Sequence, residues 1–171
     1  MTPSAPTFLG FTPDRAAMVL FAGASAGALG TALVAQFGFG LWPCALCHVQ
    51  RAPYLATLVL GLLALMPAVD RPSRRRAAEL AAALFLIATV AAGYHVGVEE
   101  RWWPGPTECT GRITEYAPVD LLAAVSQPGR TGCEEAAIRI LGISMAGYNV
   151  LLAASLTVAS MIAIRRKAWW Q

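Results

Sequence analysis

Long apolar runs without a charged residue alternate with short polar segments along most of the chain. The runs lie at residues 16–50, 52–69, 80–98 and 140–164. A helix needs about 20 apolar residues to cross the hydrocarbon core of a bilayer, and each run is close to that length or longer. The pattern therefore predicts four transmembrane helices, near residues 16–38, 48–66, 77–96 and 143–164.

The composition supports the same fold class. Of 171 residues, 57% are hydrophobic and 13% are charged, whereas about a quarter of the residues in a soluble domain are charged. We therefore expect an all-α membrane protein in which the whole chain, 1–171, forms one bundle of four transmembrane helices. The first apolar run is longer than the core of a signal peptide, so it is interpreted as a span.

One long extramembrane loop, residues 97–142, separates the third and fourth predicted spans. It is too short to build a hydrophobic core of its own. Within it, residues 119–125 contain Val119, Leu121, Leu122 and Val125, which suit a short amphipathic helix. That helix would lie on the membrane or pack on the bundle as an ordinary loop helix.

Basic residues are distributed unequally between the two sides that four spans define. Eight of the 13 lysines and arginines fall on the side of the chain ends and the short 67–76 loop. They are Arg15, Arg71, Arg74, Arg75, Arg76, Arg165, Arg166 and Lys167. The positive-inside rule places this side, with both termini, in the cytoplasm. The overall charge of +3 is thus a topology signal, and no nucleic-acid binding is expected.

All four cysteines then fall on the non-cytoplasmic side of the membrane. They are Cys44, Cys47, Cys109 and Cys133. Disulfides form and persist on that side, so the even number of cysteines predicts disulfide chemistry.

Cys44 and Cys47 form a Cys-x-x-Cys pair at the start of the second predicted span. Pro43 precedes them, and proline suits the first turn of a helix, so we expect both cysteines in that turn. Free backbone N–H groups and the helix dipole favour a thiolate there. Arg51 follows Cys47 by four residues and is expected on the same helix face.

Three other kinds of site contain a Cys-x-x-Cys pair. Residues 44–48 match the motif of c-type haem attachment, but a motif that opens a membrane helix leaves little room for a macrocycle. Zinc bound by all four cysteines would take two ligands from Cys109 and Cys133, which have 23 residues between them in the loop. Two structural disulfides are the third alternative, although so small a ring at residues 44–47 constrains the unfolded chain little. We expect no metal site.

Thiol–disulfide exchange uses both cysteine pairs. A soluble protein can reach the loop pair, and the other pair is fixed at the bilayer edge. Exchange proceeds by thiolate attack through a mixed disulfide, so electrons that enter the loop pair can pass to the fixed pair. No flavin or iron–sulfur motif is visible, which favours a lipid-soluble quinone as acceptor. Arg51 would stabilise a thiolate at Cys47 and the negative charge that develops on the quinone.

The motif Pro43-Cys44-x-x-Cys47-x-x-x-Arg51, followed by a second cysteine pair between the third and fourth spans, resembles the bacterial disulfide bond formation protein B (DsbB) family. The resemblance covers nearly all of the chain, and Tyr94-His95-x-x-x-Glu99 is also similar to some members. It implies a multi-pass protein of the bacterial inner membrane with periplasmic cysteines. Such a protein re-oxidises a periplasmic, DsbA-like thioredoxin-fold partner and passes electrons to ubiquinone or menaquinone, which it binds non-covalently.

The resemblance also implies a role for each cysteine. Cys44 and Cys47 would form the quinone-coupled pair, with Cys47 as the charge-transfer partner. Cys109 and Cys133 would form the loop disulfide, and Cys109 would be joined to the soluble protein in the mixed disulfide.

The quinone-site residues implied by the resemblance are Arg51 and His95. His48 and Gln50 depart from the family motif. His48, four residues after Cys44, is a candidate for tuning the Cys44 thiolate. In the fourth span, Tyr148 and Asn149 are expected to form interhelical hydrogen bonds rather than a site.

Two rival functions fit parts of the pattern. A membrane scaffold with structural disulfides would show no turnover. An enzyme of the vitamin K epoxide reductase type also couples thiols to quinone chemistry on a four-helix bundle. In that type the loop cysteines precede the membrane Cys-x-x-Cys, and here the order is reversed.

Overall fold

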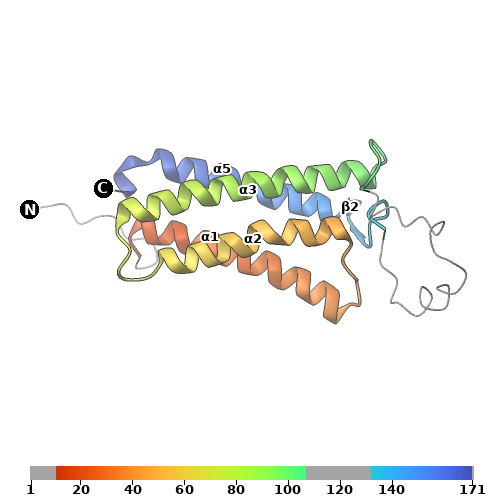
Figure 1. The fold of residues 1–171 in the computed structure, drawn as a ribbon, viewed down its shortest axis with the longest axis horizontal. Helices are drawn as coiled ribbons and strands as arrows, with labels where there is room; N and C mark the ends of the chain where they lie inside the picture. The colour runs from red at the N-terminus through yellow and green to blue at the C-terminus, as the bar shows by residue number, and fades with distance from the viewer. Residues whose placement is uncertain (1–10, 107–131, 171) are drawn as a thin grey trace, which may run out of the picture.

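Four long helices run side by side as an elongated bundle in the computed structural model (Figure 1), which describes residues 11–106 and 132–170. They are α1 (Pro13–Leu33), α2 (Ala45–Ala64), α3 (Arg71–Glu99) and α5 (Met145–Arg165). All four are long and apolar enough to cross a membrane. The prediction of a four-helix membrane bundle is confirmed.

The helix ends differ from the predicted ones where local capping decides them. A π-helical segment, η1 (Val34–Gly38), continues α1. Helix α3 begins six residues before the predicted start at residue 77. The side chain of Asp70 accepts a hydrogen bond from the backbone N–H of Ser73 and caps the helix. The arginines expected in the 67–76 loop therefore lie on the first turns of α3.

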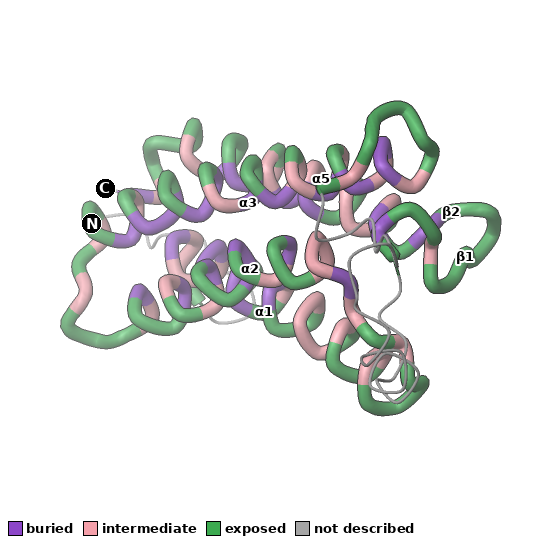
Figure 2. The backbone as a smooth tube through the Cα atoms, turned by 45° about the vertical axis from the view of Figure 1, so that its right-hand side comes forward, coloured by how far each residue is buried: buried purple, intermediate pink, exposed green. Residues whose placement is uncertain are grey.

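The bundle core forms where α3 packs against α2 and α5, and where α1 packs against α2. Phe21 and Phe85 are fully buried and meet edge to face, with ring centroids 5.8 Å apart. Gly61 lets α2 approach α1, because a Cβ there would lie 2.9 Å from the Cβ of Ala22. Small residues at such interfaces allow membrane helices to pack closely. Figure 2 shows the buried positions facing inward and the exposed ones facing out.

A buried ion pair closes the end of the bundle at which α1 begins and α5 ends. Arg74 Nη1 donates to Asp14 Oδ2 at 2.9 Å, and Arg74 Nε donates to the carbonyl of Ala64 at 3.0 Å. Both charged side chains are at least 94% buried. The pair joins α1, the end of α2 and the start of α3.

A two-stranded hairpin stands at the opposite end of the bundle, next to the cysteines. Strands β1 (Arg139–Ile140) and β2 (Ile143–Ser144) pair antiparallel. Leu141 and Gly142 form the turn with φ of 52° and 80°, the sign that a type I′ hairpin turn requires. The sequence did not predict this hairpin. Ser144 then caps α5 by accepting a hydrogen bond from the N–H of Gly147.

The chain after α3 folds back onto the helix. Trp103 Nε1 donates to the carbonyl of Tyr94 at 3.1 Å, and the two rings stack. Gly97 makes room for this ring, because a Cβ at that position would overlap it. The amphipathic helix expected within residues 119–125 lies outside the described residues.

Candidate functional site

Cys44 and Cys47 lie at the N-terminus of α2, as predicted. Cys44 is the N-cap, and its Sγ accepts a hydrogen bond from the backbone N–H of Cys47 at 3.2 Å. Pro43 precedes the cap, so it stands just outside the first turn rather than in it. Both cysteines are free, with their Sγ atoms 2.7 Å apart. A small rotation would bring the two sulfurs to the roughly 2.05 Å of a disulfide bond.

The surroundings of Cys44 favour its thiolate. The hydrogen bond from Cys47 lowers the pKa of the Cys44 thiol to about 4 against the opposing effect of burial, and His95 also lowers it. His95 Nε2 lies 3.6 Å from Cys44 Sγ. Together with the cap hydrogen bond, these contacts stabilise the thiolate of Cys44.

Cys133, near the C-terminal end of the extramembrane segment, lies next to this pair. It is 1% exposed and packs against Cys44 and Val98. Its sulfur, the sulfur of Cys44 and a ring nitrogen of His95 all lie within 4.8 Å of one another. Cys133 is disulfide-bonded, and Cys109, its expected partner, lies outside the described residues.

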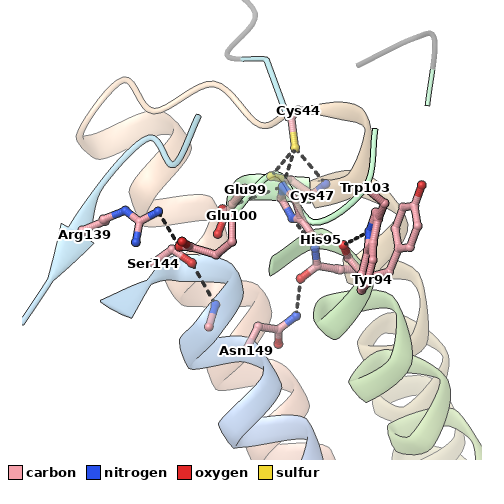
Figure 3. A network of polar contacts seen from close by, with 12 residues as sticks. Cys44, Cys47, Tyr94, His95, Glu99, Glu100, Trp103, Arg139, Ser144 and Asn149 are labelled. Carbon is pink, nitrogen blue, oxygen red and sulfur yellow. Dashed lines mark hydrogen bonds and ion pairs between the residues drawn. The ribbon is translucent and has the colours of Figure 1, made fainter. Parts of the chain in front are cut away.

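His95 and Glu99 reach the cysteines from the last turns of α3 (Figure 3). His95 is buried, and its Nε2 lies 3.9 Å from Glu99 Oε1. The other carboxylate oxygen, Glu99 Oε2, is buried and has no hydrogen-bond partner among the described residues. The sequence assigned Glu99 no role in a site. The available signal was its position four residues after His95, at the end of an apolar span.

A cavity of about 630 Å³ opens beside the cysteines. Its walls are mainly small and apolar, with Ala24, Ala28, Leu29, Ala32, Leu41 and Leu152 among the lining residues. Cys44, Cys47, Arg51 and His95 also line it. This size and this mixture of apolar walls with a few polar groups are typical of a small-molecule site.

Arg51 is held in the cavity wall by α1 and η1. Its Nη1 donates to Gln36 Oε1 at 2.7 Å, and its Nη2 donates to the carbonyl of Ala32 at 3.4 Å. The sequence predicted that Arg51 would face Cys47, and both residues line the same cavity. It did not identify Gln36, which orients the guanidinium.

Three further polar residues of the site were not predicted as site residues. Gln50 contacts His95, and Asn149 contacts both Gln50 and Tyr54. Asn149 thus forms the expected interhelical hydrogen bonds, and it also lines the cavity. Tyr148 donates instead to the carbonyl of Ile140 in the hairpin.

Metal and haem binding can be compared with this geometry. Tetrahedral zinc, with bonds of about 2.3 Å to sulfur and 2.0–2.1 Å to nitrogen, would suit the spacing of Cys44, Cys133 and His95. However, Cys133 cannot supply a thiolate while it is disulfide-bonded. The haem motif fits less well, because His48 is exposed whereas Cys44 is buried against α3.

Comparisons with known proteins agree with one another. A family model described as disulfide bond formation protein DsbB matches residues 14–163. A Rickettsia prowazekii protein, named uncharacterized protein RP370, is 34% identical over 129 residues, 73% of each chain. Disulfide bond formation protein B of Neisseria meningitidis serogroup B is 30% identical over 165 residues, covering 91% of this chain and 93% of its own. The Aromatoleum aromaticum protein of that name is 29% identical over 150 residues, covering 83% and 87%. No solved structure matches the chain.

Proposed function

Because the chain belongs to the DsbB family of disulfide bond formation proteins, we propose that it re-oxidises a periplasmic, DsbA-like dithiol protein and passes the electrons to a membrane quinone. One observation carries the proposal. The sulfur atoms of Cys44, Cys47 and Cys133 gather at one end of a membrane-spanning bundle, beside a largely apolar cavity.

The exchange begins at the loop disulfide. A thiolate of the soluble protein attacks Cys109, forms a mixed disulfide with it and releases Cys133 as a thiolate. The second thiol of the soluble protein then resolves the mixed disulfide and leaves as part of a new disulfide. In this way the soluble protein gives up two electrons and two protons, and the loop pair gains them.

Cys133 then connects the loop pair to the fixed pair. Its sulfur lies within 4.8 Å of the sulfur of Cys44, so an exchange between them requires only a short approach. When Cys44 and Cys47 are joined as a disulfide, attack at Cys44 releases Cys47. Cys109 next attacks Cys133, which restores the loop disulfide and leaves the fixed pair reduced.

The cavity is suited to the head group of a quinone. Its volume of about 630 Å³ and its largely apolar walls match a flat quinone ring with a lipid tail. A bound quinone would supply a two-electron acceptor for the reduced pair. Arg51 would hold the ring, because Gln36 and Ala32 fix its guanidinium in the wall and its other N–H groups can donate to a carbonyl oxygen.

The orientation of the bundle follows from the same proposal. The cysteine end would face the periplasm, where disulfides persist. The end that carries Arg15, Arg71 and Arg165 would face the cytoplasm. Both termini would then be cytoplasmic in the bacterial inner membrane.

The test uses the full chain in detergent with a chemically reduced, DsbA-like protein and a soluble ubiquinone or menaquinone analogue. We expect a loss of quinone absorbance that requires all four cysteines and that ends when the soluble protein is fully oxidised. If no quinone is lost while both disulfides are intact and the quinone and partner controls are active, the proposal is wrong for this partner class. A structural scaffold then becomes the better interpretation.

A further inference from the structure

Four polar side chains from three helices form a continuous chain that ends at Cys44. Tyr54 OH donates to Asn149 Oδ1 at 2.6 Å, and Asn149 Nδ2 donates to Gln50 Oε1 at 2.6 Å. Gln50 Nε2 lies 2.6 Å from His95 Nδ1, and His95 Nε2 lies 3.6 Å from Cys44 Sγ. In Figure 3, His95 lies next to Cys44 and Cys47, and Asn149 lies on α5, farther from the cysteines.

The hydrogen bonds in this series can run in only one direction, from donor to acceptor. An amide oxygen only accepts a hydrogen bond and an amide nitrogen only donates one. Because Tyr54 occupies the oxygen of Asn149, the amide nitrogen of Asn149 faces Gln50 and occupies its oxygen. The nitrogen of Gln50 is therefore the group that faces His95. It has no lone pair to offer, so His95 Nδ1 must be the acceptor.

We propose that Tyr54, Asn149 and Gln50 are positioning residues that hold His95 as the neutral tautomer with its proton on Nε2, directed at the sulfur of Cys44. The Nε2–H group then donates a hydrogen bond to the Cys44 thiolate, whose sulfur lies 3.6 Å from Nε2 and is nearer than Glu99 Oε1 at 3.9 Å. The role of this thiolate in exchange rests on the proposed function, but the tautomer itself does not.

Tyr54 determines the direction of these hydrogen bonds because it is the first residue of the series. If both amides turned over, Asn149 could donate to the oxygen of Tyr54 and Gln50 could accept from His95 Nδ1. The phenol proton of Tyr54 would then lose Asn149 as its acceptor, and the structure gives it no other hydrogen bond among the described residues. Tyr54 is 3% exposed and packs against Phe85. In such apolar surroundings, a phenol without an acceptor is unfavourable.

The tautomer also determines what else the site can bind. Cys44, Cys133 and His95 have the spacing of metal ligands. A histidine binds a metal through the lone pair of a deprotonated ring nitrogen. A proton on Nε2 makes that lone pair unavailable. The series of hydrogen bonds from Tyr54 to His95 therefore directs this nitrogen to the thiolate and disfavours metal binding by the reduced protein.

The experiment measures the ring nitrogens of His95 directly. The chain contains two histidines, and His48 is exposed, so His48→Gln leaves His95 as the sole labelled residue after growth on ring-¹⁵N histidine. The reduced protein in detergent is examined by ¹⁵N magnetic resonance near neutral pH. We expect the shift of a protonated nitrogen at Nε2 and of a bare nitrogen at Nδ1.

Tyr54→Phe keeps the ring that packs on Phe85 and removes only the hydroxyl. We expect it to move part of the population to the Nδ1–H tautomer and to raise the pH at which alkylation of Cys44 declines by at most about one pH unit, the effect of weakening one charge-assisted hydrogen bond. Tyr94→Phe is the matched control, because Tyr94 is adjacent to His95 in sequence and its hydroxyl bonds Pro104 instead. This control should change neither readout.

Three results would overturn the inference: a proton on Nδ1 alone in the otherwise unchanged protein, a doubly protonated ring at neutral pH, or a tautomer that Tyr54→Phe does not alter. None of these measurements uses quinone or a partner protein. A protein with the expected tautomer but no quinone turnover would therefore contradict the proposed function and leave this inference standing.

Discussion

Cys44 concentrates the chemistry of the site in one side chain. Its sulfur meets Cys47, His95 and the N–H that it caps, and Cys133 packs against it. The sequence favoured Cys47 as the thiolate, because Arg51 follows it by one helical turn. In the structure Arg51 is bound by Gln36 and Ala32, and the contacts that stabilise a thiolate surround Cys44. The role of Cys47 toward a quinone stays a prediction.

The lowered pKa predicts how Cys44 responds to pH. In reduced protein with Cys109 and Cys133 replaced by alanine, iodoacetamide should alkylate Cys44 at a constant rate from about pH 8 to about pH 5, whereas an ordinary thiol with a pKa of about 8.5 slows throughout that range. The rate should fall as the pH drops through the Cys44 pKa of about 4, because only the thiolate reacts. Mass spectrometry of the modified peptide gives the rate.

Cys47→Ala is the informative comparison, since the contact with Cys47 contributes most to the lowered pKa. In this variant the decline in rate should move to higher pH. An unchanged profile after Cys47→Ala, or a rate in the parent protein that falls tenfold per pH unit below about pH 8, would contradict the assignment of the thiolate to Cys44.

Arg51→Ala should weaken quinone use without affecting disulfide formation. The change removes a fixed cation from the cavity wall, and loss of one such group costs about 10²–10³-fold in rate where it stabilises developing charge. Quinone-dependent turnover measures the loss, and thiol counting shows whether all four cysteines still pair. Arg139→Ala is the matched control: Arg139 is an arginine at the same end of the bundle that pairs with Glu100, and it should retain full turnover.

At the scale of the helix, the buried ion pair of Asp14 and Arg74, at the end of the bundle away from the cysteines, holds α1, α2 and α3 together. Arg74→Ala leaves the Asp14 carboxylate buried without its partner, and such a loss destabilises a protein by about 3–5 kcal/mol. Unfolding in mixed micelles of increasing denaturing detergent should reveal this as an earlier midpoint. Arg75→Ala removes an exposed i,i+4 pair with Glu79, which is worth at most about 1 kcal/mol. Equal midpoints for the two variants would refute the structural role of the Arg74 pair.

How well each helix or strand could be predicted from the sequence depends on the physical effect that makes it form. Hydrocarbon thickness imposes a minimum length on each span, so four charge-free runs sufficed to predict four helices. The start of α3 depended instead on one hydrogen bond, from the N–H of Ser73 to the side chain of Asp70, which allowed six more residues to join the helix. The hairpin of β1 and β2 has two residues per strand, too few for an alternating pattern to be visible.

At the scale of the whole molecule, the site combines parts that sequence patterns reveal to different degrees. The Cys-x-x-Cys motif and its arginine are local, so their position at a helix start was predictable. The contact of Gln50 with His95 and Asn149 depends on how α2, α3 and α5 are rotated about their axes, which no local pattern specifies. A polar residue inside a membrane span is nevertheless a signal, because it is rarely left without a partner.

The approach of Cys133 to Cys44 joins the extramembrane segment to the membrane helices, and it yields a prediction that needs no partner protein. In Cys47→Ser, Cys44 keeps a hydrogen-bond donor beside it and cannot form its own disulfide. The Cys44 thiolate should then attack Cys133, forming a Cys44–Cys133 disulfide and releasing Cys109 as a thiolate. An alkylating agent that captures Cys109 makes the exchange irreversible. Peptide mapping without reduction identifies the bond.

The sulfur that Cys44 attacks, Cys133 or Cys109, distinguishes a specific contact from random collision. A loop that met the fixed pair at random would give Cys44–Cys109 and Cys44–Cys133 bonds together, whereas the packing of Cys133 against Cys44 favours the second. The double variant Cys44→Ser with Cys47→Ser should keep the Cys109–Cys133 disulfide throughout. A predominant Cys44–Cys109 bond would contradict the arrangement, and with it the route by which electrons leave the loop. A predominant Cys44–Cys133 bond would show that this contact is productive, because the disulfide records which sulfur the thiolate reached.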